Sequence, residues 1–390
     1  MIYLDYNATT PLCAAAWRAM QPYFERHFGN PSSVHRAGRE TRAAVDDARD
    51  RLAALLCVKP HEIIFTSGGT EANNLALLGL ARRGAPNGKH LISNRAEHHA
   101  VLHTLEHLEK REGFEVTWLD VSSEGLIDPD ELERAIRPDT TLVSVMTANN
   151  ETGVIQPIME ISARCRKHGV LLHSDMVQSF GKLPTNLDSP PFDAASFGAH
   201  KFYGPKGVGF LYLRSGLPID RIQFGGSHEG ERRPGTENVP AIVGMAERPR
   251  KRCGACPTNR NARPDLRDEL WRGIERVFPK RNRTPGARCA SPTRSMSVFP
   301  ASASETLLMA LDLEGICASS GSACMVGSVV ASHVLLAMGL SSERAASAIR
   351  FSLGKETTAS EIEQTVEAIE RILRRRKSPA ATDQAQHALV

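Results

Sequence analysis

Short apolar runs alternate along the chain with longer stretches in which apolar residues recur at helical intervals. The clearest helical stretch covers residues 34–56, and a second covers residues 71–80. Strands that alternate with helices usually pair in parallel and are covered by helices on both faces, so this pattern predicts an α/β fold. Ligands bind such sheets at the carboxyl ends of the strands. The candidate strands are residues 62–66, 91–93, 115–119, 142–145, 170–173 and 208–212.

The pattern changes in the last third of the chain. Residues 249–264 contain prolines, many basic residues and a Cys-x-x-Cys pair, Cys253 and Cys256, and we expect an irregular junction there. Helical periodicity returns near the end of the chain. There, Ser360 and Glu363 form a predicted capping box ahead of an apolar helical stripe.

The length of the chain predicts more than one domain. A chain of 390 residues with 41% hydrophobic content exceeds what one hydrophobic core usually organises. We predict a large domain over residues 16–250. A smaller domain is predicted to combine residues 1–15 with residues 265–377, and residues 378–390 are expected to be a disordered tail.

The charge balance excludes some classes of partner. Charged residues make up 24% of the chain, and 48 basic against 44 acidic residues leave a formal charge of +4. So weak a charge predicts no direct binding to nucleic acid or to an anionic membrane. Asp5 interrupts the apolar start that a signal peptide would need, and no run of about 18 apolar residues occurs. A cytoplasmic protein is therefore expected.

The eight cysteines then need an explanation, because a reducing compartment disfavours disulfides. Cys324 lies among glycine, serine and alanine residues, which predicts an exposed loop and an accessible thiol. Cys57 and Cys165 fit the description of packing residues better. Cys253 and Cys256 lack a second pair with the spacing of a zinc site, so no metal is expected there.

Three segments carry candidate chemistry, and two of them lie at predicted strand ends. Residues 66–71 (TSGGTE) lead from a strand through two glycines into a helix, where backbone amides can hold a phosphate. Asp175 ends a strand, and Lys201 lies among small and aromatic residues that would lower the pKa of its amine. Plainer explanations are an N-capped turn, a helix cap and a surface lysine. Together, the three match the needs of pyridoxal phosphate for a phosphate cradle, an acid and a Schiff-base lysine.

At this point the motifs resemble cysteine desulfurases of the NifS/IscS type, within the class V aminotransferase group of fold-type I pyridoxal phosphate enzymes. The similarity runs from Tyr3 to about Leu353. It implies a large domain with a mixed, mostly parallel sheet between helices and a smaller α/β C-terminal domain. The matching segments are residues 4–11 (LDYNATTP), 67–74 (SGGTEANN), 97–101 (EHHAV), 149–153 (NNETG), 233–238 (RPGTEN) and 332–340 (SHVLLAMGL), with those around Asp175, Lys201, Cys324 and Arg350.

The resemblance implies a role for each position that matches the family's motifs. His98 would stack on the cofactor ring, Asp175 would contact the ring nitrogen and Lys201 would form the Schiff base. Thr236 would reach the cofactor phosphate of the other subunit, which implies a homodimer. The full set of implied cofactor contacts is Gly69, Thr70, His98, Asn150, Asp175, Gln178, His200, Lys201 and Thr236.

The resemblance also implies a reaction on L-cysteine. Arg350 would pair with the substrate carboxylate, with Asn7 nearby. Lys201 is the expected base, and His98 is expected to assist the thiol of Cys324. Cys324 would take the sulfur as a persulfide while L-alanine departs. The acceptor would be a protein such as an iron–sulfur scaffold or a thiolation enzyme, and Cys324 would be a transient ligand of an iron–sulfur cluster.

Other activities fit the same motifs. A selenocysteine lyase or a class V aminotransferase would share the cofactor site, and an aminotransferase would not need Cys324. A protein with weakened cofactor binding that acts as a partner in sulfur transfer is a third alternative.

The chain departs from the family's pattern at several positions. Gly198 stands where relatives usually have a phosphate-binding serine, and Ser196 or a water molecule would have to replace that hydroxyl. Ala331 stands where a proline commonly starts the helix after the catalytic loop. The largest departure is at residues 249–264, where relatives continue with a helix.

Overall fold

The computed structural model describes residues 1–183, 190–247, 264–278, 294–298, 304–320 and 331–377. The chain divides into two compact units. One consists of Thr9–Asn150 and Val154–Asn259, and the other of Met1–Ala8, Glu151–Gly153 and Arg260–Val390. The domain boundaries given above stay a prediction.

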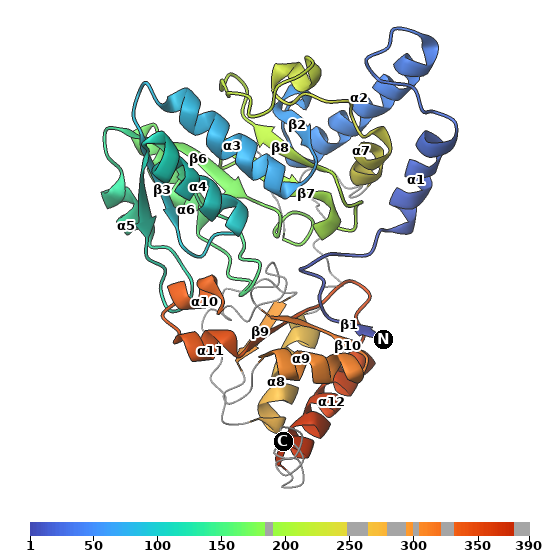
Figure 1. Ribbon diagram of the computed structural model, residues 1–390, viewed down its shortest axis with the longest axis vertical. Coiled ribbons are helices and arrows are strands. Elements are labelled where there is room, and N and C mark those ends of the chain that lie inside the picture. Colours follow the sequence, from blue (N-terminus) through green and yellow to red (C-terminus); the bar gives the residue numbers. More distant parts are fainter. Residues whose placement is uncertain (184–189, 248–263, 279–293, 299–303, 321–330, 378–390) are drawn as a thin grey trace, which may run out of the picture. The chain divides into compact units, whose positions relative to one another are not determined.

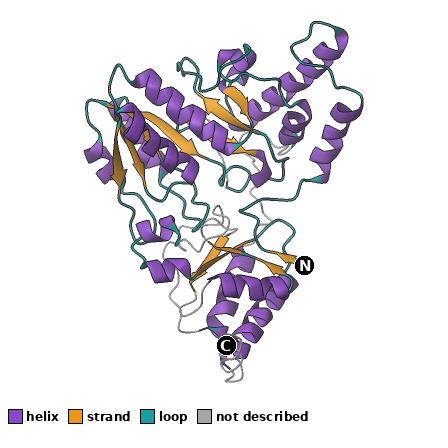
Figure 2. Cartoon of the chain, in the orientation of Figure 1, coloured by secondary structure: helices purple, strands orange, loops and turns teal. Residues whose placement is uncertain are grey.

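The larger unit is built around a 7-stranded sheet (Figures 1 and 2). Neighbouring strands from β7 to β4 are parallel, and β8 is antiparallel to both of its neighbours. The predicted α/β fold with a mostly parallel sheet is therefore confirmed. The spatial order is β2 (Ile63–Thr66), β8 (Gly209–Leu213), β7 (Ala194–Gly198), β6 (Leu171–Asp175), β5 (Thr140–Ser144), β3 (His90–Asn94) and β4 (Glu115–Leu119).

Helices cover this sheet and extend beside it (Figure 1). α3 crosses β7 and β8, and both α1 and α2 pack against α7. The helices are α1 (Ala14–Glu25), α2 (Arg36–Leu56), α3 (Gly69–Gly84), α4 (His99–Glu112), α5 (Pro129–Ala135), α6 (Ile158–His168) and α7 (Val239–Ala246), with short 3-10 turns η1 (Pro60–Glu62), η2 (Ala199–Lys201) and η3 (His228–Glu231).

β7 is a strand that the apolar pattern does not reveal. Its sequence, Ala-Ala-Ser-Phe-Gly, has no β-branched residue, yet all five residues are buried. Its phenylalanine, Phe197, stacks on Phe210 of β8 with ring centroids 4.2 Å apart, and Phe180 contacts both rings edge-on. Small residues along β7 allow α3 to pack close to the strand, so the position of β7 depends on tertiary packing more than on propensity.

The smaller unit has its own core. β11 (Ser319–Ser320), β12 (Ala348–Ser352) and β9 (Arg294–Val298) form an antiparallel sheet, and β1 (Ile2–Tyr3) pairs in parallel with β10 (Ile316–Cys317). Leu4, Phe351 and Ile369 are fully buried members of its apolar cluster. The helices are α8 (Pro264–Val277), α9 (Ser304–Leu313), α10 (His333–Ala337), α11 (Ser342–Ala346) and α12 (Ala359–Lys377).

The capping box predicted at Ser360 and Glu363 is wrong by two residues. The hydroxyl of Thr358 accepts from the backbone N–H of Glu361, and the carboxylate of Glu361 accepts from the N–H of Thr358. α12 therefore begins at Ala359, and the hydroxyl of Ser360 instead contacts Gln364. The pair Thr358 and Glu361 and the pair Ser360 and Glu363 both have the spacing of a capping box, and the preceding turn decides between them.

Within the described residues, no helix is long and apolar enough to cross a membrane.

Candidate active site

The phosphate cradle predicted from the sequence lies where β2 leads into α3. Three backbone segments meet closely there, so that a side chain would clash at Gly69 and Gly209 and would be tight at Gly198. A Cβ on Gly69 would lie 2.5 Å from Val177, a Cβ on Gly198 would lie 3.3 Å from the Gly69 nitrogen, and a Cβ on Gly209 would lie 2.8 Å from Gly68. The N-cap residue Gly68 has no side chain to cap the amides of the first turn of α3, which suits a phosphate site, and Thr70 is exposed beside them.

A partly buried ion pair holds the start of α3. The carboxylate of Glu71 accepts from the backbone N–H of Ser67 at 2.7 Å and from the Arg233 guanidinium at 2.7 Å. Burial opposes ionisation of Glu71, but the hydrogen bonds from Arg233 and Ser67 outweigh it and hold the pKa of the carboxyl below its usual value. The cradle is therefore tied to the segment that carries Thr236.

Asp175 ends β6 and is almost fully buried. One carboxylate oxygen accepts from the backbone N–H of Val177 at 2.9 Å, as the capping explanation requires. The other accepts from the side-chain amide of Asn73 at 2.7 Å, and Asn73 comes from α3. Sequence reasoning assigned no role to Asn73, although it lies within the motif at residues 67–74. Asp175 therefore serves as a cap and also holds a fixed carboxylate at the carboxyl edge of the sheet.

Asp175 and Lys201 both lie within electrostatic reach of His98. Burial lowers the pKa of His98, the charge of Lys201 acts in the same direction, and Asp175 opposes both. His98 is the N-cap of α4, and its Nδ1 accepts from the backbone N–H of Ala100 at 3.1 Å. That hydrogen bond places the proton of the neutral ring on Nε2. The structure thus brings together three of the residues that the sequence singled out.

His200 precedes Lys201 in η2, directly after β7. Burial lowers the pKa of His200 to about 4, and the charges of Lys201, Lys206 and Lys182 contribute to the shift. The imidazole is therefore neutral near pH 7. Its Nδ1 lies 3.2 Å from the hydroxyl of Thr9.

Two further predicted contacts come from neighbouring strand ends. Asn150 is half-buried in the segment after β5, and Gln178 is buried after β6. Lys182 donates to Oε1 of Gln178 at 2.7 Å, and Lys182 itself is 8% exposed. No sequence signal marked Lys182, because a lysine four residues after a glutamine is common on exposed helices.

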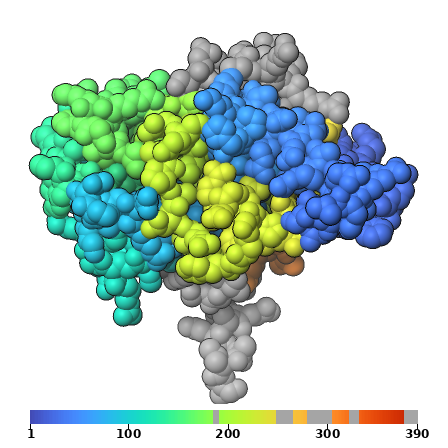
Figure 3. Space-filling model, turned by 90° about the horizontal axis from the view of Figure 1, so that it is seen from above, coloured from blue at the N-terminus to red at the C-terminus, as the bar shows by residue number. Residues whose placement is uncertain are grey.

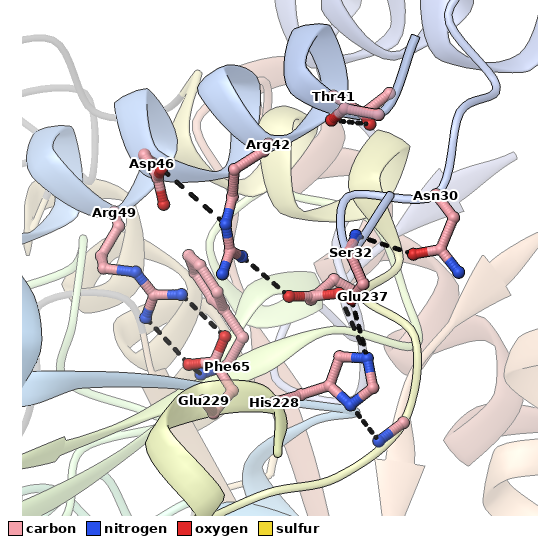
Figure 4. A network of polar contacts seen from close by, with 12 residues as sticks. Asn30, Ser32, Thr41, Arg42, Asp46, Arg49, Phe65, His228, Glu229 and Glu237 are labelled. Atoms are coloured by element: carbon pink, nitrogen blue, oxygen red, sulfur yellow. Dashed lines mark hydrogen bonds and ion pairs between the residues drawn. The ribbon is translucent and has the colours of Figure 1, made fainter. Parts of the chain in front are cut away.

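Thr236 is exposed on a segment that buried charges anchor to α2 (Figures 3 and 4). Arg49 donates to both oxygens of Glu229 at 2.7 and 2.8 Å, and Arg42 donates to Glu237 at 2.9 Å. Figure 3 shows this segment, in yellow, beside the blue surface of α2. The exposure of Thr236 therefore does not come from a loose loop.

The smaller unit holds the two residues predicted to bind substrate. Arg350 lies in β12 at 3% exposure, and its guanidinium donates to the Asp5 carboxylate at 2.9 Å. The backbone N–H of Asn7 donates to the Ser352 hydroxyl at 2.9 Å. Sequence reasoning noted Asp5 only as an interruption of the apolar start, whereas the fold uses it to orient Arg350.

Ser196 does not replace the serine missing at position 198. Its side chain is fully buried, and its hydroxyl is hydrogen-bonded to Nε2 of His173 at 3.0 Å, inside the sheet. The backbone at Gly198 therefore borders the cradle without a hydroxyl.

The structure changes the predicted assignment of the cysteines to packing roles. Cys165 is buried in α6, and burial raises the pKa of its thiol to about 12, as suits a packing residue. Cys57 is only half-buried and is disulfide-bonded, so its interpretation as a packing thiol is wrong. The predicted positions Cys324, Cys253 and Cys256 lie outside the described residues. Among the residues that are described, no cluster of histidine, cysteine or acidic side chains has the geometry of a metal site.

These residues fit pyridoxal phosphate. A glycine-lined helix start suits a phosphate, a buried carboxylate suits a protonated ring nitrogen, and a lysine within electrostatic reach of His98 suits a Schiff base.

Comparison with known proteins agrees with this fit. Residues 2–365 match the class V aminotransferase family. The chain is 44% identical over 379 residues to the cysteine desulfurase IscS of Dictyoglomus turgidum, covering 95% of this chain and 94% of that protein. A solved NifS-like protein superposes with a TM-score of 0.88 at 36% identity, covering 96% of this chain and 99% of the other. SspA, solved in complex with cysteine, superposes with a TM-score of 0.78 at 34% identity, covering 92% of this chain and 100% of the other.

Proposed function

Because the chain belongs to the class V aminotransferase family, and within it to the cysteine desulfurases of the IscS and NifS type, we propose that it removes sulfur from L-cysteine and releases L-alanine. The cofactor of this family is pyridoxal phosphate. The observation that best supports the proposal is the cluster of Asp175, His98 and Lys201 at the carboxyl edge of the sheet, beside the glycine cradle.

The residues of the larger unit would hold the cofactor. The first turn of α3, with Gly69 and Thr70, would bind the phosphate, and His98 would stack on the ring. The carboxylate of Asp175, fixed by Asn73, would keep the ring nitrogen protonated. When bound, the cofactor supplies an electron sink for the bonds at the substrate's α-carbon. The remaining proposed contacts are Asn150, Gln178, His200, Lys201 and Thr236.

Arg350 and Asn7 would bind the substrate carboxylate. A guanidinium that already donates to Asp5 has lost much of its rotamer freedom, so less entropy is lost when it pairs with a carboxylate. Lys201 would hold and move the α-proton of the substrate, because its amine lies within electrostatic reach of His98, the residue proposed to stack on the ring.

Cys324 would be the nucleophile. Its thiolate would attack the sulfur of the substrate, so that a sulfur–sulfur bond forms as the carbon–sulfur bond breaks. The persulfide would then pass to an acceptor protein, such as an iron–sulfur scaffold or a thiolation enzyme, and Cys324 would also be a transient ligand of an iron–sulfur cluster. The relatives named IscS support this assignment.

A homodimer would complete the cofactor site. Thr236 is exposed and rigidly held, which suits a contact with the phosphate of a partner subunit. α1 and the segment after it also expose Trp17 (49%), Phe24 (60%) and Phe28 (81%), large apolar side chains that an interface would cover. We place this dimer in the cytoplasm.

Release of alanine and sulfide tests the proposal. Protein loaded with pyridoxal phosphate is incubated with L-cysteine and a thiol reductant, and alanine and sulfide are measured together. The Cys324→Ala variant is expected to lose sulfide formation. Cys165→Ala, which removes a buried thiol, is the matched control and keeps it. Equal sulfide production by Cys324→Ala and the parent would overturn the role of Cys324.

A further inference from the structure

Glu97 is a buried acid that the proposed chemistry does not use. It directly precedes His98 and is completely buried. An acid at 0% exposure is costly unless the structure uses its oxygens, so its contacts call for a specific role.

Those contacts join the ends of two strands. One carboxyl oxygen, Oε1, accepts from the side-chain amide of Asn94 at 3.0 Å and from the backbone N–H of Met146 at 2.6 Å. Asn94 is the last residue of β3, and Met146 follows β5. A second link runs in parallel, because the side-chain amide of Asn149 donates to the carbonyl of Ala96 at 2.9 Å. The segment that carries His98 is therefore bonded to the segment that carries Asn150.

The same segment after β5 is bonded to the end of β6. The backbone N–H of Thr147 donates to the carbonyl oxygen of Asp175 at 3.1 Å, and the Thr147 hydroxyl lies 2.8 Å from the Ser174 hydroxyl. A continuous path of hydrogen bonds thus runs from Glu97 through Met146 and Thr147 to Asp175. It spans three strand ends that each supply a proposed cofactor contact.

We propose that Glu97 is a positioning residue that fixes the His98 ring relative to Asp175 and Asn150 for binding of the pyridine ring. This inference rests on the proposed cofactor site. Glu97 touches neither cofactor nor substrate in this account, and it acts through the backbone of its neighbours. Residues that do not contact a ligand can still hold the contacting side chains in place, and Glu97 would do this for His98.

The charge state of Glu97 suits this role. Burial raises the pKa of Glu97 to about 8, and the Asp175 carboxylate contributes to the rise. Near pH 7, Glu97 is therefore mostly a neutral acid, and its oxygens serve as hydrogen-bonding groups rather than as a second charge beside Asp175. A neutral amide of the same shape should then replace it.

Two variants separate positioning from charge. Glu97→Gln keeps an acceptor at Oε1, whereas Glu97→Ala removes it and leaves the Met146 N–H unpaired. The dissociation constant of pyridoxal phosphate is measured on apoprotein, together with the visible circular dichroism of the bound cofactor. Glu97→Ala is expected to bind the cofactor about ten- to hundredfold more weakly and to alter its dichroism, the range found for lost outer contacts. Glu97→Gln stays close to the parent in both.

Two further variants serve as controls for the Glu97 experiment. Glu106→Ala removes an exposed acid of α4 that pairs with Lys110, and it should change neither readout. If Glu97→Ala does not fold, Glu97→Asp, which withdraws the carboxyl by one methylene, is measured instead. Parental binding and dichroism in the shortened variant would overturn the proposal, and so would equal damage in Glu97→Gln. Failure of the proposed cofactor site is distinguishable, because the parent itself would then bind no pyridoxal phosphate. Failure of the desulfurase reaction is seen separately, as a parent that binds pyridoxal phosphate but releases no alanine and sulfide from L-cysteine.

Discussion

The ammonium of Lys182 donates a hydrogen bond to Oε1 of Gln178 at 2.7 Å, and both side chains are buried. An ammonium has no acceptor, so the Gln178 atom that faces it must be the carbonyl oxygen. The orientation of the amide is therefore set, with its NH₂ group turned away from Lys182. In the proposed cofactor site, this orientation would let the Gln178 amide donate to the phenolic oxygen of pyridoxal phosphate, a contact that the family resemblance implies.

Replacing Lys182 should change two measurable quantities, the pKa of His200 and the dissociation constant of pyridoxal phosphate. In Lys182→Met, the pKa of His200 should rise above its value of about 4, because one of the lysine charges that lower it is gone. The rise should be partial, since burial is the larger cause. NMR titration of the imidazole measures it. The dissociation constant of pyridoxal phosphate should also increase about tenfold as the Gln178 amide loses its orientation. An unchanged pKa in Lys182→Met would contradict the account, and Lys182→Arg is the charge-retaining control.

The bidentate pair of Arg49 and Glu229 should dominate the stability of the segment that carries Thr236 (Figure 4). The Glu229 side chain is 2% exposed, and it also accepts from the backbone N–H of Phe65 at 3.0 Å. Glu229→Gln leaves the Arg49 charge uncompensated, so the free energy of unfolding should fall by about 3–5 kcal/mol. Urea denaturation measures the change.

An exposed pair gives the matched control. Arg36 and Glu40 lie 2.8 Å apart on the surface of α2. Glu40→Gln should leave the free energy of unfolding close to that of the parent, because water and salt already screen this exposed pair. Equal losses in Glu229→Gln and Glu40→Gln would contradict the distinction between the buried and the exposed pair.

His173 should make stability depend on pH. It is fully buried between the hydroxyls of Ser144 and Ser196, and burial lowers its pKa to about 3. Between that value and the usual pKa of about 6.5, the unfolded chain binds a proton that the folded chain does not. The folded state should therefore lose up to about 1.4 kcal/mol for each pH unit as the pH falls through this window.

The His173→Gln variant isolates this contribution. Glutamine keeps a donor and an acceptor for the two hydroxyls but does not titrate. The difference in unfolding free energy between parent and variant should change across the window and level off above about pH 6.5. A difference that stays constant from pH 4 to pH 7 would exclude the buried neutral imidazole.

Arg350 should control the affinity for the substrate. Arg350→Lys replaces a planar fork by a point charge, so KM for L-cysteine should rise about tenfold, as expected for loss of one charge-assisted hydrogen bond. Asp5→Asn keeps the shape of the orienting group but weakens its hold on Arg350, and it should raise KM less. The two effects are separated by steady-state kinetics with the cofactor saturated. A normal KM in Arg350→Lys would place the carboxylate site elsewhere.

Features within a single segment could be predicted from the sequence. The strand candidates, the glycine turn before α3 and the position of Asp175 at a strand end follow from local pattern, and Lys201 is marked only by its small and aromatic neighbours. Residues whose partners are distant in sequence could not be predicted. Glu97 and Met146, or Arg350 and Asp5, meet only because the sheets place them side by side. The sequence pattern did not predict β7 for the same reason, because its small residues suit close packing against α3 and do not have strong strand propensity.

The location of the transferred sulfur tests the central claim most directly. Protein loaded with pyridoxal phosphate is given less than one equivalent of L-cysteine without reductant, and its peptides are alkylated and analysed by mass spectrometry. The account predicts one extra sulfur on the peptide that contains Cys324, formed in step with alanine, and none on the peptide that contains Cys165. Alanine formation with the extra sulfur on another cysteine, or on none, would contradict it.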